Sequence, residues 1–503
     1  MDVTPPGNGE HTSARESAGA SWRRAQRLGL WLGPAAFMAV LLLPVPDGLG
    51  FPAWVCVGLL VLMATWWVTE AIPIPITALL PLVVMPLFGV ASMREAAAPY
   101  FSPIVVLLMG GFIAATAVER WRLHERLALL TILRAGSGRK ALIAGFLAAS
   151  AVLSAWISNT ATSIMLMPVA LSVAAQLGGH RGEGSALTIS LVLAVAYGAS
   201  IGGLATPIGT PTNLIVIGAL EGAGETRLTF ARWMMLGVPA VLLMLPAAWL
   251  VLAGRLGPPA ADAGDPMAVV RRRLQALGGW TVPERRTLLV FGVMAFFWVF
   301  RGAFIQDLTV FGAQPFAGLS DALIAVAGGI AMFLVPSGCS RERGTMLLDW
   351  DTAVKLPWDV LLLFGGGLSL AAAITATGLG PWLGNQMAAL SALPMVVILL
   401  VLTTFVILST EFTSNVATAA TLMPVILALG AATDMDPAIL ALPVALAASC
   451  AFMFPMATAP NAIAYATDEM SIAQMARIGV RVNLLGVAAI TLLAWLLTPL
   501  VLG

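Results

Sequence analysis

The chain has 503 residues, of which 59% are hydrophobic and only 10% are charged, and its formal net charge is +1. This balance lies far outside the range of soluble domains and places the chain in a bilayer. The small net charge identifies no partner.

The first residues of the chain are polar, and we predict that residues 1–27 form a disordered cytoplasmic tail rather than a cleaved signal peptide. Apolar stretches long enough to cross roughly 30 Å of hydrocarbon follow. The sequence therefore predicts an all-α polytopic membrane protein with about eleven transmembrane helices and no attached catalytic domain. The clearest stretches lie at 28–45, 51–69, 74–91, 101–119, 226–254, 287–303, 319–336, 357–377 and 478–503.

The positive charges predict the orientation of the chain. With a cytoplasmic N-terminus, every Lys and Arg falls on the inner side except Arg94, Arg227, Arg232 and Arg301. Because inner loops of membrane proteins are rich in Lys and Arg, we expect a multi-pass protein of the cell inner (plasma) membrane with its N-terminus in the cytoplasm.

One long loop, about 255–286, divides the chain into an N-terminal half, 28–254, and a C-terminal half, 287–503. It carries the basic runs "RRR" at 271–273 and "ERR" at 284–286. We interpret this cytoplasmic linker as an anchor beside anionic lipid and expect no nucleic acid partner.

The two halves repeat each other. Superposing them aligns Ser158 with Ser414, Asn159 with Asn415 and Pro168 with Pro424, and the stretch "TPIGTPTN" at 206–213 with "FPMATAPN" at 454–461. The first copy follows the basic stretch "RAGSGRK", whereas the matching stretch before the second copy has no Lys or Arg. The copies therefore enter the membrane from opposite faces, which indicates two inverted repeats with a binding site near the bilayer midplane.

Each copy predicts one re-entrant helical hairpin and one interrupted helix. The hairpins, about 141–176 and about 395–430, turn at a polar tip, and the interrupted helices contain 206–213 and 454–461. Broken helix ends offer amide N–H groups to anions and carbonyl groups to cations. Because these four segments contain no Lys or Arg, we expect an anion to be held together with bound Na⁺.

Other interpretations of these residues remain open. Ser158 and Ser414 are suitable helix N-caps, but capping alone does not explain two matched tips and two matched interruptions. We interpret Glu411 as a structural hydrogen-bonding residue in preference to a proton or cation site, and Glu70 as a helix-end residue. The paired glycines at 110–111 and 365–367 are predicted close-packing positions. No nucleophile–base or metal constellation is visible, so we expect no enzyme, and caged polar tips suit a carrier better than a channel.

Six motifs carry a family resemblance that covers nearly everything after residue 50. The chain resembles the divalent anion/sodium symporters, which carry dicarboxylates, citrate or sulfate. The resemblance implies a homodimer in which a transport domain moves against a scaffold domain like an elevator. The motifs are "WWVTEAIPIPITALLP", "GGFIAATAVERWRLHERLAL", "SNTATSIMLMP", "FGGGLSL", "TEFTSNVATAATLMP" and "SCAFMFPMATAPNAI".

The resemblance also implies site residues. The expected ligands of the first sodium site are Ser154, Ser158, Asn159 and the backbone at Gly209, and those of the second site are Thr410, Ser414, Asn415 and the backbone at Ala457. The expected substrate-binding residues are Ser158, Asn159, Thr160, Thr210, Ser414, Asn415, Val416 and Thr458.

This sequence departs from the family pattern at three of its positions. Val416 stands where the family often has Thr, and Thr212 and Ala459 replace one of two frequent prolines in each loop.

The repeat, the polar tips and the resemblance together predict Na⁺-coupled import of a C4-dicarboxylate of the succinate, malate or fumarate type. A sodium-independent dicarboxylate exchanger and a Na⁺-coupled citrate or sulfate symporter are the alternatives.

Overall fold

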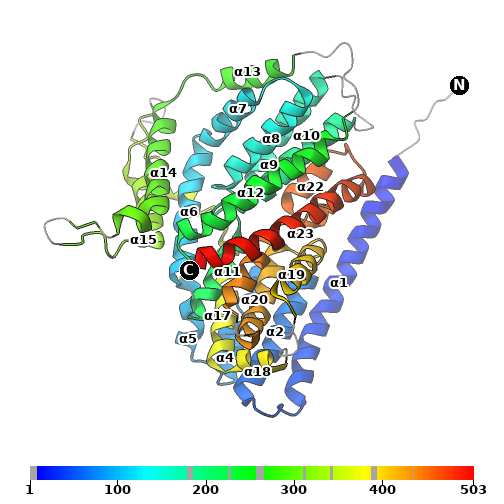
Figure 1. Ribbon diagram of the computed structural model, residues 1–503, viewed down its shortest axis with the longest axis vertical. Coiled ribbons are helices and arrows are strands. Elements are labelled where there is room, and N and C mark those ends of the chain that lie inside the picture. Colours follow the sequence, from blue (N-terminus) through cyan, green and yellow to red (C-terminus); the bar gives the residue numbers. More distant parts are fainter. Residues whose placement is uncertain are drawn as a thin grey trace.

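The computed structural model shows an elongated bundle of helices (Figure 1). Within the described residues the chain forms no strand, and one isolated bridge joins Pro336 to Met346. The predicted all-α class is confirmed. The structure describes residues 8–177, 185–224, 228–256, 265–306, 308–309, 313–339, 344–386, 393–433 and 435–502.

The N-terminal half holds the first hairpin and the first interrupted helix. Its helices are α1 (Asn8–Leu42), α2 (Phe51–Thr69), α3 (Ile74–Thr77), α4 (Leu80–Leu87), α5 (Met93–Ala97), η1 (Ala98–Phe101), α6 (Pro103–Arg120), α7 (Leu123–Ala135), α8 (Arg139–Ser154), α9 (Asn159–Gln176), α10 (Ala186–Gly202), α11 (Pro211–Gly222) and α12 (Phe230–Ala253).

The linker contains one helix, and the C-terminal half repeats the order hairpin, interrupted helix, long helix. These helices are α13 (Pro266–Ala276), α14 (Val282–Phe300), η2 (Arg301–Ile305), α15 (Asp321–Leu334), α16 (Trp350–Ala353), α17 (Trp358–Ala376), α18 (Leu379–Gln386), α19 (Met395–Thr410), α20 (Asn415–Thr433), α21 (Pro437–Ala448), η4 (Pro455–Ala457), α22 (Ala459–Tyr465) and α23 (Ile472–Leu502).

Within the described residues, six helical stretches are long and apolar enough to cross a membrane. Several shorter apolar helices accompany them, including both arms of the second hairpin and both long arms of the interrupted helices. The six stretches are Arg24–Leu42, Phe51–Thr69, Met93–Arg120, Phe230–Ala253, Trp358–Ala376 and Ile472–Val501.

The N-terminal tail differs from the prediction. Helix α1 reaches back to Asn8, so the expectation of disorder is wrong for residues 8–27, and residues 1–7 lie outside the described part of the chain. The segment 10–27 is free of proline and rich in Ala and Arg, which favour helix and allow the apolar helix to continue beyond the membrane.

Paired glycines allow helices of the bundle to approach closely. A Cβ atom at Gly110 would lie 2.5 Å from the backbone carbon of Ala325, and one at Gly366 would lie 2.1 Å from the carbonyl oxygen of Ala78. These two positions therefore exclude any side chain, as the close-packing interpretation predicted.

The linker is tied to the helical bundle by a buried ion pair. The Arg126 guanidinium of α7 donates to Glu284 Oε1 at 2.8 Å, and both side chains are about 4% exposed. Arg126 also donates to the carbonyl oxygens of Leu277, Gly278 and Gly279. Since Glu284 caps α14, this one cluster fixes α7, the end of the linker and the start of the second half.

Candidate functional site

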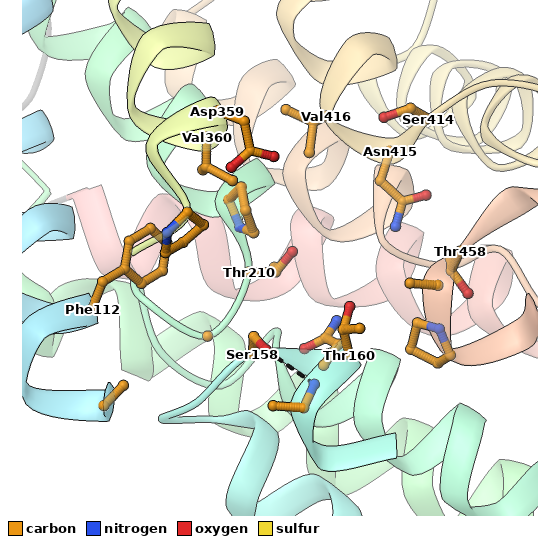
Figure 2. A pocket seen from close by; sticks show the side chains of 18 of the residues that line it. Phe112, Ser158, Thr160, Thr210, Asp359, Val360, Ser414, Asn415, Val416 and Thr458 are labelled. Atoms are coloured by element: carbon orange, nitrogen blue, oxygen red, sulfur yellow. Dashed lines mark hydrogen bonds between the residues drawn. The ribbon is translucent and has the colours of Figure 1, made fainter. Parts of the chain in front are cut away.

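The first helix break lies between α8 and α9. Ser158 caps α9, and its Oγ accepts a hydrogen bond of 3.1 Å from Ala161 N–H (Figure 2). Ser154, the last residue of α8, donates from its hydroxyl to Asn159 Oδ1. The side chain of Asn159 is therefore oriented by a buried hydroxyl group on the preceding arm.

The second break repeats this arrangement at the matched positions. Thr410 is the last residue of α19. Its hydroxyl group lies within hydrogen-bonding distance of two acceptors, Asn415 Oδ1 at 2.7 Å and the Ala448 carbonyl oxygen at 2.8 Å. Ser414 Oγ accepts a long hydrogen bond of 3.5 Å from Ala417 N–H at the start of α20. Both asparagines thus start a helix and carry their side-chain oxygen against a hydroxyl group one turn behind them.

The turns of the two interrupted helices are also built alike. Asn213 Nδ2 donates to the carbonyl oxygens of Gly203 and Thr206, at 2.9 and 2.8 Å. Asn461 Nδ2 donates to the carbonyl oxygens of Ala451 and Phe454, at 3.0 and 3.1 Å. These asparagines, buried at the start of α11 and α22, close the non-helical turns that the sequence places at 206–213 and 454–461.

Two contacts join the interrupted helices to each other. Thr212 Oγ1 lies 2.7 Å from Ser449 Oγ, and both residues are buried. Tyr197 Oη in α10 donates to the carbonyl oxygen of Phe452 at 2.8 Å, and the two rings lie 4.9 Å apart. The threonine that departs from the family pattern at position 212 therefore connects the two repeats.

One cavity of about 800 Å³ receives the tips of both hairpins. In Figure 2, Ser158 and Thr160 approach it from one wall, while Ser414, Asn415 and Val416 approach it from the opposite wall, with Thr210 between them. The predicted site residues that line the cavity are Ser158, Asn159, Thr160, Gly209, Thr210, Ser414, Asn415, Val416, Ala457 and Thr458.

The two remaining predicted ligands, Ser154 and Thr410, do not line the cavity. Both are completely buried behind it and hydrogen bonded to the asparagines. They orient the side-chain oxygens of Asn159 and Asn415.

Oxygen atoms converge next to Asn159. A Cβ atom added to Gly203 would lie 3.0 Å from Asn159 Oδ1 and 3.1 Å from the Gly209 carbonyl oxygen. The space that this glycine leaves open between two neutral oxygens suits a small hard cation. The equivalent residue of the second half is Ala451, which carries a Cβ atom, so the two breaks are not identical.

The neutral tips of α9 and α20 offer N–H groups to an anion, because both helices begin at the cavity. Sequence reasoning missed the charged residues of the other wall. These are Glu119 and Arg120 at the end of α6, Lys355, and Asp359 in the first turn of α17, all of which line the cavity. Asp359 gave a signal as a carboxylate inside the predicted span 357–377, and Glu119 gave a weaker one at the very end of the predicted span 101–119.

Glu70 and Glu411 have different surroundings. Glu70 ends α2 with a φ of 46°, as the helix-end interpretation predicted, and it also lines the cavity. Glu411 does not line it; this carboxylate accepts hydrogen bonds from the backbone N–H groups of Phe452, Met453 and Phe454 and from Asn483 Nδ2. The structural interpretation of Glu411 agrees with these contacts.

Comparison with known sequences gives a match along nearly the whole chain. A family model described as "Sodium:sulfate symporter transmembrane region" matches residues 25–502. The sodium-dependent dicarboxylate transporter SdcS of Staphylococcus saprophyticus is 38% identical over 492 residues, which cover 96% of this chain and 93% of that protein. The protein of the same name from Staphylococcus aureus strain MRSA252 is 36% identical over 487 residues, covering 95% and 92%.

Two solved transporter structures share the fold. The YdaH transporter of Alcanivorax borkumensis aligns with a TM-score of 0.58 at 16% identity and covers 89% of this chain and 98% of its own. MtrF of Neisseria gonorrhoeae aligns with the same TM-score at 15% identity and covers 91% and 96%. At these identities the likeness concerns the fold alone.

Proposed function

The chain belongs to the sodium:sulfate symporter family, and from that premise we propose that it is a secondary active transporter that imports a C4-dicarboxylate such as succinate, malate or fumarate together with Na⁺. One observation supports this most directly: Asn159 and Asn415, each at the start of a broken helix, line the same cavity. The relatives named as sodium-dependent dicarboxylate transporters support the ion and the class of substrate.

The dianion lies between the hairpin tips in this proposal. Its two carboxylates accept hydrogen bonds from Asn159 and Asn415 and from the N–H groups that begin α9 and α20. The hydroxyl groups of Thr160, Thr210 and Thr458 add neutral donors around it. Because the tips contain no Lys or Arg, the positive potential at the tips themselves comes from helix ends and bound cations.

Each asparagine also faces a cation in this proposal. The first Na⁺ is held by oxygens of Asn159, Ser158 and Gly209, with Ser154 fixing the amide, and the second by Asn415, Ser414 and Ala457 with Thr410 in the same role. Sodium therefore completes the anion site, because each cation brings its charge to an otherwise neutral tip.

The energetics of dianion uptake favour this coupling. Moving a dianion inward against a membrane potential of −100 mV costs about 4.6 kcal/mol, at roughly 2.3 kcal/mol per charge. Two Na⁺ ions cancel that electrical cost, and the sodium concentration gradient then drives uptake.

An elevator-type movement is the mechanism we propose, with the hairpins and interrupted helices as the moving unit and α2 to α6 with α14 to α17 as the scaffold. The rings of Trp156, Phe230 and Trp298 form a stack that joins the two units, with centroid separations of 6.1 and 4.8 Å. Phe230 N–H donates to Asp321 Oδ2 at 2.9 Å in the same region. A reducible bifunctional thiol reagent that links cysteines introduced at Trp156 and Phe291, whose rings are in contact, should stop transport until the link is reduced.

We place the cavity on the cytoplasmic side of the membrane, because the charged wall of the cavity is formed by the inner ends of α2 and α6 and the start of α17. A cytoplasmic N-terminus and an inner membrane location follow from the distribution of Lys and Arg. The family resemblance supports a homodimer, and the mass of the detergent-solubilised protein tests this.

Uptake of labelled succinate into proteoliposomes tests the function. We expect accumulation with an inward Na⁺ gradient and none when choline replaces Na⁺; equal uptake in choline rejects the coupling. Counterflow in sodium-free buffer distinguishes an exchanger, and competition by unlabelled citrate and sulfate distinguishes the other symporters.

A further inference from the structure

A carboxylate points into the cavity that we assign to a dianion. Asp359 lies in the first turn of α17 and is exposed to the cavity space. In Figure 2 its side chain is directed inward beside Val416, above Thr210. Within the described part of the chain, its carboxylate oxygens form no hydrogen bond or ion pair. The negative charge of Asp359 therefore acts on whatever occupies the cavity.

Helix structure accounts for part of this placement. An acidic residue in the first turn stabilises the positive end of a helix, so an aspartate is favoured at this point of α17. This charge–dipole interaction requires only that the carboxylate lie near the helix end, in whatever direction the side chain points. It does not explain why the carboxylate faces the site of an anion.

The cationic side chains of the same wall offset Asp359 only in part. Arg120 forms an ion pair with Asp349 Oδ2, so its positive charge is partly neutralised by a residue that lies outside the hairpin tips. Lys355 precedes α17 by less than one turn and lines the cavity, as do two further carboxylates, Glu70 and Glu119. The scaffold wall is therefore not a positively charged surface.

When Na⁺ and substrate are both bound, the charges in the cavity balance only for a substrate that carries two negative charges. Two Na⁺ ions and two helix N-termini of about half a charge each supply roughly three positive charges. A dianion and Asp359 supply three negative charges, and the formal charges of the other lining residues cancel, since Arg120 and Lys355 match Glu70 and Glu119 in number. A cargo with three carboxylates leaves one negative charge uncompensated.

The neighbours of Asp359 reinforce this limit. Val360 and Val416 bring apolar side chains to the same end of the cavity, where they suit the methylene carbons of a C4 chain. A third carboxylate placed against these two valines would lose part of its hydration without gaining a donor from them, which costs free energy.

We propose that Asp359 is a charge filter that restricts the cargo to dianions and excludes tricarboxylate trianions. The inference rests on the proposed function and names the specificity of the same site. Repulsion across a partly hydrated cavity of this size corresponds to roughly tenfold discrimination against each additional negative charge.

Competition in proteoliposomes tests the filter. Uptake of labelled succinate is measured at mildly alkaline pH against unlabelled citrate and unlabelled tricarballylate, which are then trianions. In Asp359→Asn we expect the KM for succinate to fall, because the dianion is also relieved of repulsion, and the inhibition constants of both trianions to fall by about tenfold more than that KM.

Two variants provide matched controls. Asp359→Glu keeps the charge and should keep the wild-type discrimination. Asp351→Asn removes an exposed first-turn acid from the neighbouring helix α16, outside the cavity lining, and should also leave discrimination unchanged. A role of Asp359 in helix stability alone predicts that both Asn variants behave alike.

Several results would overturn the inference. Unchanged trianion inhibition in Asp359→Asn would reduce Asp359 to a helix-end residue, and a changed Na⁺ dependence with unchanged trianion inhibition would make it a cation ligand. Thermal shifts of purified protein by citrate supply a second readout that needs no transport: citrate should stabilise Asp359→Asn and not the wild type. Failure of wild-type succinate uptake in sodium would instead reject the proposed function.

Discussion

Glu411 accepts a hydrogen bond of 2.7 Å from the backbone N–H of Phe452, and this contact joins the break of the second hairpin to the turn of the second interrupted helix. The matched position in the first half is Ala155. Its carbonyl oxygen accepts a hydrogen bond from the hydroxyl of Thr206, which lies in the first interrupted turn. In both repeats the hairpin break thus supplies the acceptor and the interrupted turn the donor, but the second repeat uses a carboxylate and backbone N–H groups where the first uses a carbonyl and a hydroxyl group.

We predict that Glu411→Gln destabilises the protein by about 2–4 kcal/mol. The carboxylate accepts from four donor groups, and the amide NH₂ of glutamine would face some of them with its own hydrogens. Thermal unfolding in detergent measures the effect, with Leu408→Met on the exposed face of α19 as the control. An unfolding temperature equal to that of the wild type would show that the donors do not require a charged acceptor.

We predict that Asn159→Ala and Asn415→Ala each weaken apparent substrate affinity by about tenfold to a hundredfold. Each loses a hydrogen bond to a charged group, worth roughly 1.5–3 kcal/mol. The concentration dependence of succinate uptake measures the loss, and Ser172→Ala on the exposed face of α9 is the control. Near-normal uptake by both asparagine variants would place the binding site elsewhere.

Gly203→Ala should weaken Na⁺ binding while preserving the fold. The added Cβ atom lies 3.0 Å from Asn159 Oδ1, so it occupies the space between the two oxygens that we assign to the first cation. We expect the Na⁺ concentration for half-maximal uptake to rise by about tenfold, corresponding to about 1.4 kcal/mol. Gly292→Ala, which meets open space, is the control, and equal Na⁺ dependence in the two variants would contradict this assignment.

The hairpin ends and the interrupted turns could be predicted from sequence, because a polar triplet or a Pro-rich turn that recurs at matched positions inside two apolar runs favours a helix break. The duplication then predicted that Asn159 and Asn415 would face one cavity. The contacts that could not be predicted are made by residues far apart in the sequence. Asp359 and Lys355 reach the site only because α17 packs beside the hairpins, and Glu411 finds its amide donors some 40 residues later in the chain.

Departures from the repeat were equally hard to interpret from sequence alone. Thr212 is a substitution without an evident role until its hydroxyl is found 2.7 Å from Ser449. The helical start of α1 was missed because its polar composition was interpreted as disorder. A polar segment that leads directly into an apolar helix can instead extend that helix.

The contact between Thr212 and Ser449 should couple the two repeats energetically. In a double-mutant cycle of Thr212→Val and Ser449→Ala, we expect a coupling energy of about 1 kcal/mol, since each single variant removes the same buried hydrogen bond. Unfolding free energies of the four proteins measure it. Additive losses would show that the two hydroxyl groups act independently.

Acid should weaken the junction at which Arg120 meets the loop before α16. Hydrogen bonds from Thr352, with a smaller effect of Arg120, hold the pKa of Asp349 below its ordinary value. The folded state thus binds fewer protons at this carboxyl than the unfolded state, whose pKa is about 3.9, so the stabilisation is complete above that value and is lost as the pH falls through the lower folded pKa. Because Asp349 is largely exposed, we expect a small effect. Unfolding temperatures measured across the acid range should show a wild-type advantage over Asp349→Asn that shrinks on acidification. A constant offset between wild type and Asp349→Asn at all pH values would contradict the role of the ionised carboxylate.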